Sequence, residues 1–491
     1  MRTATVAFLA AVLTASLLTP LVRAAALRLG FLDHALTSRK AHGRPIPRLG
    51  GLAIVVGFYA PLTALFFVNS EVGHRFWEHP DKAFGLFAGG LVIAALGVWD
   101  DLRGTGARKK FLVQFAVAGA MYGLGFRIDL ISNPWGEALQ LGWLGLPFTM
   151  LWIAGVINAM NLIDGLDGLA GGVALIAIGT TFAMSALRGE PLMILFTAAL
   201  AGAVLGFLFY NFNPASIFMG DTGSMFLGFV LATTTIQTSQ KATTAVAIVV
   251  PIIALGIPIA DTLLAMARRA ARGAPLFSAD RGHIHHRLVD LGLSHRQAVL
   301  VLYGASILLG GSALALSYAS SSQTTVVLLA ISAVGYLALR KLGYVSIAKA
   351  QQILADRKFN HELRSAVRRV GSSLRSAKDL PEVWAALRLA AEALSATAVA
   401  LHLPEPPPGL GPLTAGFDPP PRGAFRARYG LFPERPGDTH LELGWTDGRV
   451  HVDRDTEIAI ELVCDHVSAA LDRIARSPGP AVPLKVVNLG P

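Results

Sequence analysis

Polar side chains that could hold a cation gather at three points of an otherwise apolar chain. Two adjacent carboxylates end one apolar run, four acidic or amide residues spaced by three end another, and a third group precedes a later run. Carboxylate and amide oxygens are the ligands that a hard divalent cation takes, and neighbouring carboxylates repel each other unless positive charge lies between them. The three groups are Asp100 and Asp101; Asn158, Asn161, Asp164 and Asp167; and Asn211, Asn213 and Asp221.

Each group also has a simpler interpretation. Asp100 and Asp101 could lie in a solvated loop, or one of them could be a general base with a raised pKa. An aspartate is a common helix N-cap, which would account for Asp221 alone. One cap does not need four polar residues in ten positions, and Gly165 and Gly168 permit tight turns with the backbone close to a ligand. The middle group is therefore the strongest prediction of a site for a cation with sugar or phosphate groups.

Histidine and arginine side chains suited to phosphate lie together later in the chain. His283, His285 and His286 stand within four positions, and Arg287 follows them. Zinc binding is one alternative and a solvated loop is another, but no cysteine is nearby and the flanking arginines would repel a cation. His and Arg donate charge-assisted hydrogen bonds to phosphate oxygens, which is the interpretation that this loop favours.

Further charged residues stand beside apolar runs. Lys40, His42 and Arg48 precede the second run, and Lys110 precedes the fourth. They could contact phosphate, or they could simply mark loops on the cytoplasmic side of a membrane. Asp261 lies late in an apolar run and is a functional candidate, because acids inside a membrane are costly, although it could pair with the arginines that follow it.

The composition places these residues in a membrane protein. Of the 491 residues, 53% are hydrophobic and 15% are charged, against roughly 25% charged in soluble domains, so a soluble enzyme and a disordered chain are both excluded for most of the sequence. Residues 1–341 hold 39 charged side chains and residues 342–491 hold 35. Nearly all of the net charge of +10 belongs to the first part, which indicates cytoplasmic loops and lipid headgroups rather than nucleic acid. The single cysteine, Cys464, excludes an intrachain disulfide.

Eleven apolar segments are candidates to cross a membrane, for which about 20 residues are needed. The first could instead be a signal peptide, because Arg2 precedes it. Lys and Arg concentrate in the loops after the first, third and ninth segments, so we expect the N-terminus outside and the C-terminal region in the cytoplasm. The segments are 4–29, 49–68, 83–99, 111–126, 141–159, 168–187, 191–210, 224–239, 243–265, 297–318 and 323–341.

The three polar groups and the histidine loop then fall at the cytoplasmic face. A transporter or flippase would place polar residues near the middle of the membrane, where only Asp261 comes close. Acids for a cation and basic groups for phosphate at one face suit phosphoryl transfer between a soluble activated donor and a lipid acceptor. The sequence has no Gly-x-x-x-x-Gly-Lys-Ser/Thr loop, which disfavours an ATPase.

The last part of the sequence predicts a separate unit in the cytoplasm. Residues 342–403 predict a helical connector and the start of a domain, and residues 404–491 predict a small α/β region that begins with a Pro-rich loop at 404–436. Residues 440–452 alternate like a strand pair with an Asp-Gly turn, and residues 455–476 predict a closing amphipathic helix. This unit faintly resembles a GAF-type regulatory module, and a docking domain without ligand is the alternative. The predicted fold is an all-α polytopic membrane protein with about eleven transmembrane helices and a C-terminal cytosolic α/β domain.

Six segments resemble, in order and in spacing, the motifs of the polyprenyl-phosphate N-acetylhexosamine-1-phosphate transferases. The resemblance extends over residues 1–341, which it implies to be the transmembrane domain. The segments are DHALTSRKAHGRPIPRLGG (33–51), GVWDD (97–101), NAMNLIDGLDGLAGG (158–172), NFNPASIFMGDTGSMFLGF (211–229), PIAD (258–261) and DRGHIHHRL (280–288).

The resemblance implies a reaction and its partners. The phosphate of a polyprenyl phosphate, typically undecaprenyl phosphate, attacks the β-phosphorus of a UDP-N-acetylhexosamine, and UMP leaves. Mg²⁺ is required, with Mn²⁺ as a substitute. Members of the family act in the bacterial inner membrane with the active site on the cytoplasmic side. They catalyse the first membrane step of a surface polysaccharide and often form homodimers.

The resemblance also implies roles for individual residues. Asp221 is the expected direct metal ligand, together with Asp100. Asp100 and Asp101 would position or deprotonate the lipid phosphate, and Asp164 and Asp167 would complete the catalytic set beside the nucleotide and the metal. The expected substrate-binding residues are Lys40, His42, Arg48, Lys110, Asn158, Asn161, Asn213, His283, His285, His286 and Arg287.

The histidine loop indicates the donor. The sister subfamily that transfers phospho-N-acetylmuramoyl-pentapeptide typically has a His-His-His-Phe loop, whereas this chain has His283-Ile284-His285-His286-Arg287. The loop resembles that of the simple-sugar subfamily. UDP-N-acetylglucosamine is therefore the expected donor, and the muramoyl-pentapeptide donor is the alternative.

Overall fold

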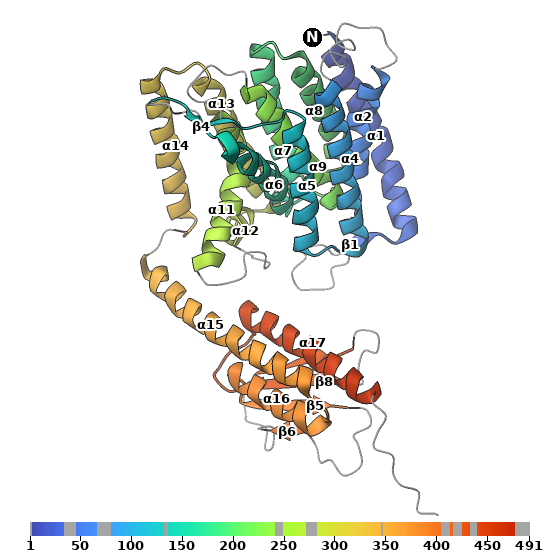
Figure 1. The fold of residues 1–491 in the computed structure, drawn as a ribbon, viewed down its shortest axis with the longest axis vertical. Coiled ribbons are helices and arrows are strands. Elements are labelled where there is room, and N and C mark those ends of the chain that lie inside the picture. Colours follow the sequence, from blue (N-terminus) through green and yellow to red (C-terminus); the bar gives the residue numbers. More distant parts are fainter. Residues whose placement is uncertain are drawn as a thin grey trace, which may run out of the picture. The chain divides into compact units, whose positions relative to one another are not determined.

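The computed structural model (Figure 1) contains two compact units, one of residues 1–267 and 279–346 and the other of residues 268–278 and 347–491. Each unit has a hydrophobic core of its own. The structure describes residues 2–33, 46–65, 80–131, 133, 136–240, 249–271, 282–344, 347–403, 413–415, 425–432 and 439–476.

The first unit is a bundle of helices with two short strand pairs. In the described part its helices are α1 (Arg2–Leu29), α2 (Gly51–Ala64), α4 (Pro80–Arg103), α5 (Ala107–Gly123), α6 (Gly145–Ile163), α7 (Leu169–Leu187), α8 (Pro191–Asn211), α9 (Gly220–Gln240), α10 (Val249–Ala254), α11 (Gly256–Ala271), α12 (Ile284–Asp290), α13 (His295–Leu316) and α14 (Ser321–Lys341), with a 3-10 turn at Gly142–Leu144. The strands are β1 (Leu32–Asp33) with β2 (Ile46–Pro47), and β3 (Leu130–Ile131) with β4 (Leu139–Gln140).

Each of the eleven predicted apolar segments overlaps a helix in the described part of this unit. Seven of the described helices are long and apolar enough to cross a membrane. Helix α2 has 14 residues, and the predicted ninth segment is divided at Leu255 between α10 and α11. The unit is that of a helical membrane protein, and the count of eleven spans stays a prediction.

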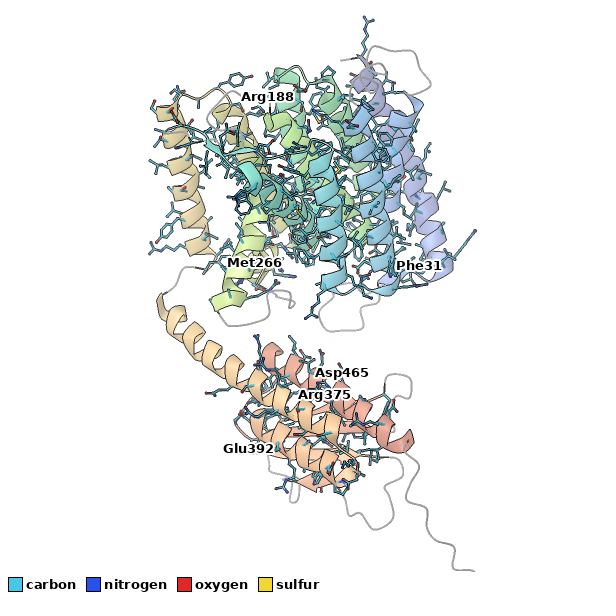
Figure 2. All side chains as sticks on the ribbon, in the orientation of Figure 1. Phe31, Arg188, Met266, Arg375, Glu392 and Asp465 are labelled. Atoms are coloured by element: carbon cyan, nitrogen blue, oxygen red, sulfur yellow. The ribbon has the colours of Figure 1, made fainter. Side chains whose placement is uncertain are left out.

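Helix α9 lies inside the bundle, packed against α2, α4, α6 and α7 (Figure 1). Phe226 and Phe229 are fully buried, as is the polar run Thr233–Thr235. Each of these threonine hydroxyls donates to a carbonyl three or four residues earlier, which satisfies it within an apolar interior. In the last turn of α9 the Thr238 carbonyl accepts from Arg188, which follows α7 (Figure 2).

Glycines let the first turn of α9 approach two neighbouring helices closely. A Cβ atom at Gly97 of α4 would lie 2.4 Å from the Cα of Thr222. A Cβ atom at Gly51 of α2 would lie 2.1 Å from the backbone nitrogen of Gly223. Because backbone atoms cannot swing aside as a side chain can, only glycine permits these contacts. The end of α4 and the start of α2 are thereby held against the residues around Asp221.

The second unit packs three helices on one face of a four-stranded sheet, with alternate strand residues in its core. Trp445 is fully buried there, and its indole nitrogen donates to the Leu394 carbonyl at 3.1 Å. The last helix coincides with the predicted closing helix. The elements are α15 (Ile347–Ser376), α16 (Leu380–Ala393), β5 (Ala398–His402), β6 (Thr414–Ala415), β7 (Phe425–Gly430), β8 (His440–Trp445) and α17 (Arg454–Arg476).

The strand order β6-β5-β8-β7, antiparallel throughout, corrects two predictions. The strand pair predicted at 440–452 is wrong, because only its first half is a strand, and that strand pairs with β5 and β7. Beyond it Arg449 binds the Asp447 carboxylate and covers the Trp445 ring, so the chain turns toward α17 instead. The loop predicted at 404–436 contains β6 and β7, because alternate apolar residues of β7 pack on the core despite the nearby prolines.

Replacing Gly97 with alanine should destabilise the first unit. The added methyl group would overlap the backbone of Thr222, and overpacking costs about 1–3 kcal/mol. Gly155 of α6 is the matched control, because no atom of the described residues lies within 4 Å of a Cβ atom placed there. Thermal unfolding in detergent, followed by tryptophan fluorescence, should show a lower transition temperature for Gly97→Ala than for Gly155→Ala. Equal transition temperatures would contradict the packing described above.

Candidate active site

The carboxylate of Asp101 joins the last turn of α4 to the first turn of α9. Its oxygens accept hydrogen bonds from the backbone nitrogens of Asp221 (2.9 Å) and Thr222 (3.0 Å) and from the Thr222 hydroxyl (2.6 Å). A helix N-terminus leaves such amides unpaired and favours negative charge, so Asp101 caps α9 from another helix. Gly220 makes room for it, since a Cβ atom there would lie 2.6 Å from the carboxylate.

Lys110 binds two carboxylates that come from different helices. Its Nζ lies 2.5 Å from Oδ2 of Asp100 and 2.7 Å from Oδ2 of Asp221. The other oxygen of Asp100 accepts from the amide of Thr105, at 2.5 Å, in the turn between α4 and α5. The two predicted metal ligands therefore meet around one positive charge.

Asp164 faces the same acids without a hydrogen bond to its carboxyl group among the described residues. It directly follows α6 and interacts with the charges of Asp221, Asp101 and Asp167. Burial and these negative charges raise the pKa of Asp164 to about 7. Ionising this carboxyl group is unfavourable unless a cation compensates for its charge.

Asp167 fixes the segment between α8 and α9. Its Oδ2 accepts from the side chain of Asn213 at 2.9 Å and from the amide of Ala215 at 3.0 Å. The side chain of Asn211 accepts from the amide of Gly168 at 3.2 Å. These bonds hold the turn after α6 against the turn after α8, so Asp167 and Asn213 position the site through the backbone.

Asn158 and Asn161 connect α6 to its neighbours. Asn158 donates to Oε1 of Gln114 in α5 at 2.6 Å, and Asn161 donates to the Ser224 hydroxyl in α9 at 2.9 Å. Gln114 lies one helical turn after Lys110. The two amides therefore set how α5, α6 and α9 surround the acidic residues.

The histidine loop reaches the acidic residues through α12. A Cβ atom at Gly165 would lie 2.4 Å from Nε2 of His285, so this ring packs directly on the turn that contains Asp164. Burial lowers the pKa of His285 to about 3, and the ring is therefore neutral at neutral pH. Its Nδ1 has no hydrogen-bond partner within the described residues, and the ring of His286 lies 4.3 Å away, centroid to centroid. A buried nitrogen without a partner is suited to bind a ligand.

Asp261 orients His283 at the start of α12. Its carboxylate lies 2.8 Å from Nδ1 of His283 and accepts from the amide of Ile284 at 2.7 Å. These two contacts account for the burial of the Asp261 carboxylate. The alternative that the sequence left open, in which Asp261 pairs with the arginines that follow it, is not needed. One turn later, the guanidinium of Arg287 lies 5.9 Å from the ring centroid of Tyr344, and its Nε has no partner within the described residues.

The described residues just before α2, which include Arg48, lie against the approach to α9. Lys40 and His42 fall outside the described residues. Arg48 follows β2, and three residues later the amide of Gly51 donates to the Met219 carbonyl at 2.8 Å. The backbone around Arg48 is therefore held against the segment that leads into α9.

Thr222 and Tyr303 are among the residues of the site that were not predicted from the sequence. The hydroxyl of Thr222 donates to the carboxylate of Asp101. Thr222 lies in the first turn of α9, where backbone amides have no partner within the helix, and this position could have indicated an acceptor such as Asp101. The hydroxyl of Tyr303 donates to the Gly168 carbonyl at 2.6 Å across 135 residues of sequence. No local pattern could have indicated this second contact, since it depends on how α13 packs on α7.

The acids have the chemistry of a site for a hard divalent cation. Asp100 and Asp221 already hold the ammonium group of Lys110 between them, and Asp164 has an ionisable oxygen pair without a hydrogen bond in the described part. Carboxylate oxygens suit Mg²⁺ or Mn²⁺ better than softer metals. His285, which packs on the turn that contains Asp164, and Arg287, in the same helix, each have an unpartnered nitrogen in the described part, and both suit an anionic ligand.

Comparison with known proteins agrees with this arrangement. Residues 83–239 match the family model of glycosyl transferase family 4. The chain is 40% identical over 316 residues to the probable undecaprenyl-phosphate N-acetylglucosaminyl 1-phosphate transferase of Bacillus subtilis (strain 168), covering 64% of this chain and 85% of that protein. It is 36% identical over 304 residues to the decaprenyl-phosphate N-acetylglucosaminephosphotransferase of Mycolicibacterium smegmatis, covering 57% and 74%. It is 28% identical over 299 residues to the undecaprenyl-phosphate alpha-N-acetylglucosaminyl 1-phosphate transferase of Salmonella typhi, covering 59% and 78%.

The bundle and its acidic helix ends define a membrane-embedded transferase. The matched region contains Asp100, Asp101, Lys110, Asp164 and Asp221, so the family likeness lies where the geometry places the site. The chain belongs to glycosyl transferase family 4.

Two aspartate variants should differ in their effect on stability. Asp101→Asn weakens three hydrogen bonds to a charged acceptor, so it should lower the unfolding free energy by about 1.5–3 kcal/mol. Asp164→Asn removes a carboxyl group that is costly to ionise, so it should leave the metal-free protein as stable as the wild type or more stable. Thermal unfolding in EDTA at pH 8 distinguishes the two. A loss of stability in Asp164→Asn would contradict the interpretation of this residue.

The stability of the metal-free protein should also depend on pH through Asp164. Its pKa of about 7 in the folded protein lies above the value of about 3.9 expected for the unfolded chain. The folded state therefore binds the extra proton between these pH values, and the contribution is present at low pH and lost as pH rises through 7. Unfolding measured from pH 5 to 8 should show this loss in the wild type relative to Asp164→Asn. Parallel curves would contradict the assignment.

Proposed function

We propose that this chain transfers N-acetylglucosamine 1-phosphate from a UDP-linked donor to a polyprenyl phosphate. Support comes from the names of the relatives, which are N-acetylglucosaminyl 1-phosphate transferases or N-acetylglucosaminephosphotransferases of undecaprenyl or decaprenyl phosphate. The observation that carries the proposal is the meeting of Asp100 and Asp221 at Lys110. Two carboxylates with an ammonium group between them suit a site that binds a cation together with the phosphates of two substrates.

The transfer is a substitution at phosphorus. An oxygen of the lipid phosphate attacks the β-phosphorus of the sugar nucleotide. The bond from that phosphorus to the oxygen that bridges to the α-phosphorus breaks, and UMP leaves with the bridging oxygen. The lipid phosphate is mostly ionised at neutral pH, so it can attack without a base. The protein then has to position two anions and to neutralise their charge.

Asp221, Asp100 and Asp164 would hold Mg²⁺, or Mn²⁺ in its place. The bound ion would supply positive charge beside the phosphate oxygens. Lys110, which bridges two of these acids, brings an ammonium group to the same place for the lipid phosphate. Asp101 acts on the position of Asp221, since it binds the amide of that residue.

The histidine loop would bind the donor. His285 is neutral and has a free ring nitrogen, and Arg287 has an unpartnered Nε, so both can donate to the diphosphate or the sugar. His283 is held in one orientation by Asp261, which fixes the tautomer of the ring. The muramoyl-pentapeptide donor is disfavoured, because the relatives described above are all named for N-acetylglucosamine.

The proposal includes the place of the protein in the cell. Residues 1–341 cross the bacterial inner membrane eleven times, with the N-terminus outside and the acidic residues at the cytoplasmic face. Residues 342–491 lie in the cytoplasm. The distribution of Lys and Arg between alternate loops supports this orientation. The reaction would be the first membrane step of a surface polysaccharide, and the family resemblance implies that the enzyme can form a homodimer.

Purified protein in detergent should release UMP from UDP-N-acetylglucosamine when undecaprenyl phosphate and Mg²⁺ are present. Asp221→Asn removes a carboxylate from the cation and from Lys110, so it should lower the rate about 100-fold or more. Removal of divalent ions with EDTA should abolish release, and added Mn²⁺ should restore it. Chromatographic measurement of UMP follows each case.

Asp290→Asn is the control, since this exposed aspartate at the end of α12 is outside the acidic residues and should leave the rate unchanged. UDP-N-acetylmuramoyl-pentapeptide is offered in parallel. Release from that donor alone would contradict the proposed substrate. Release that persists in EDTA or in Asp221→Asn would contradict the proposed site.

A further inference from the structure

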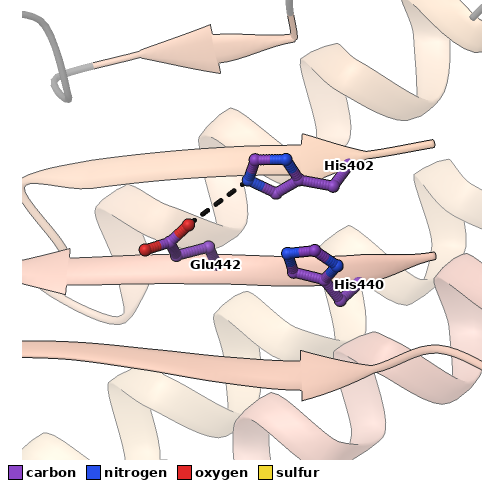
Figure 3. A group of neighbouring side chains, drawn as sticks. All are labelled: His402, His440 and Glu442. Atoms are coloured by element: carbon purple, nitrogen blue, oxygen red, sulfur yellow. Dashed lines mark hydrogen bonds and ion pairs between the residues drawn. The ribbon is translucent and has the colours of Figure 1, made fainter. Parts of the chain in front are cut away.

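Two histidines and a glutamate lie together on the sheet of the second unit (Figure 3). His402 of β5 and His440 of β8 are direct partners across the antiparallel pair, and Glu442 follows two positions along β8. Leu401 and Leu441 belong to the core under the helices. Since neighbouring residues of a strand face opposite sides, the three polar side chains share the face that points away from that core.

The three side chains are close enough to share one ion. One ligand atom from each lies within 4.8 Å of the other two, and Nε2 of His402 lies 3.3 Å from Oε2 of Glu442. Zinc–nitrogen bonds of about 2.0–2.1 Å place tetrahedral ligands about 3.3 Å apart. The rings of His402 and His440 are stacked, and the side chain of His402 is 44% exposed, so it can rotate to complete the approach.

Glu442 is a buried carboxylate with unused acceptor capacity. Its side chain is 7% exposed, and its one contact of hydrogen-bond length in the described part is the contact with His402. Arg426 and Arg428 each lie 3.7 Å from one of its oxygens, which is too long for a good hydrogen bond. A buried carboxylate is costly unless it is closely paired, so this group is suited to bind a further cation.

We propose that His402, His440 and Glu442 bind a divalent transition-metal ion of the zinc class. Two imidazoles and one carboxylate are a ligand set that zinc takes in proteins, and they leave a fourth position for water or another ligand. This site lies in the second unit and contains none of the residues assigned above to the transfer reaction.

The residues around the site leave room for the ion, and the two nearby arginines repel it only weakly. Gly430 is the β7 partner of His440, and no described residue lies within 4 Å of a Cβ atom placed on it, so the described part of the chain leaves space beside His440. The side chains of Arg426 and Arg428 are 40% and 70% exposed, so water screens their charge. Beside a metal-bound Glu442 they would act as outer partners of the carboxylate.

The test is zinc binding by the full-length protein. Protein in detergent, with Mg²⁺ in excess, is equilibrated with Zn²⁺, freed of unbound metal by gel filtration and analysed for zinc by mass spectrometry. Relative to the wild type, His402→Ala/His440→Ala and Glu442→Gln should each lose about one zinc ion per chain. His451→Ala removes an exposed histidine of the same unit and should keep the zinc content of the wild type.

A spectroscopic measurement separates loss of the site from loss of folding. Co²⁺ in place of Zn²⁺ should give visible absorption bands of a four-coordinate ion in the wild type and in His451→Ala, and not in Glu442→Gln. Near-ultraviolet circular dichroism confirms that Glu442→Gln, which keeps the shape of the side chain, is folded. Equal zinc content and equal Co²⁺ spectra in the wild type and Glu442→Gln would overturn the proposal. Equal zinc loss in His451→Ala would overturn it as well, since it would indicate unspecific binding by surface histidines.

Discussion

The hydrogen bonds from the first turn of α9 to the carboxylate of Asp101 are the contact on which the rest of the membrane unit depends. They fix the end of α4 against the start of α9. Gly97 and Gly51 allow the backbones of α4 and α2 to approach α9 closely, and Gly220 leaves room for the carboxylate. Asp100 and Asp221 are brought together as a direct consequence, with Lys110 between them. Asp101 therefore acts on the site through the fold, as a cap placed on α9 by a different helix.

The remaining polar residues divide between those that build the site and those left available to a ligand. Four of them form hydrogen bonds with other protein groups and hold the turns and helices in place. These four are Asp167, Asn158, Asn161 and Asp261. The carboxyl group of Asp164 and ring or guanidinium nitrogens of His285 and Arg287 have no hydrogen-bond partner in the described part. Groups of this second kind cost stability in the free protein, which is typical of residues kept for binding and catalysis.

The sequence predicted the membrane unit well because apolar segments of about 20 residues have few alternatives to a helix. It also predicted which polar residues gather, since they stand out in an apolar chain. The sequence could not distinguish the carboxylate that caps a helix from the one that is available to a cation. Asp100 and Asp101 are adjacent, and they differ only in which groups of the folded protein lie beside them. The contact of Tyr303 with Gly168 and the pairing of β8 with β5 depend on tertiary packing. For the same reason the turn at Asp447, which has the sequence of a hairpin, leads into α17 instead of a second strand.

In the proposed site, acids from α4, α9 and the turn after α6 would hold one divalent cation together. Electron paramagnetic resonance of Mn²⁺ bound to the full-length protein tests it most directly. The full-length protein should give a signal of bound Mn²⁺ that Asp290→Asn retains and that Asp221→Asn abolishes. A signal that is unchanged in Asp221→Asn would contradict the account.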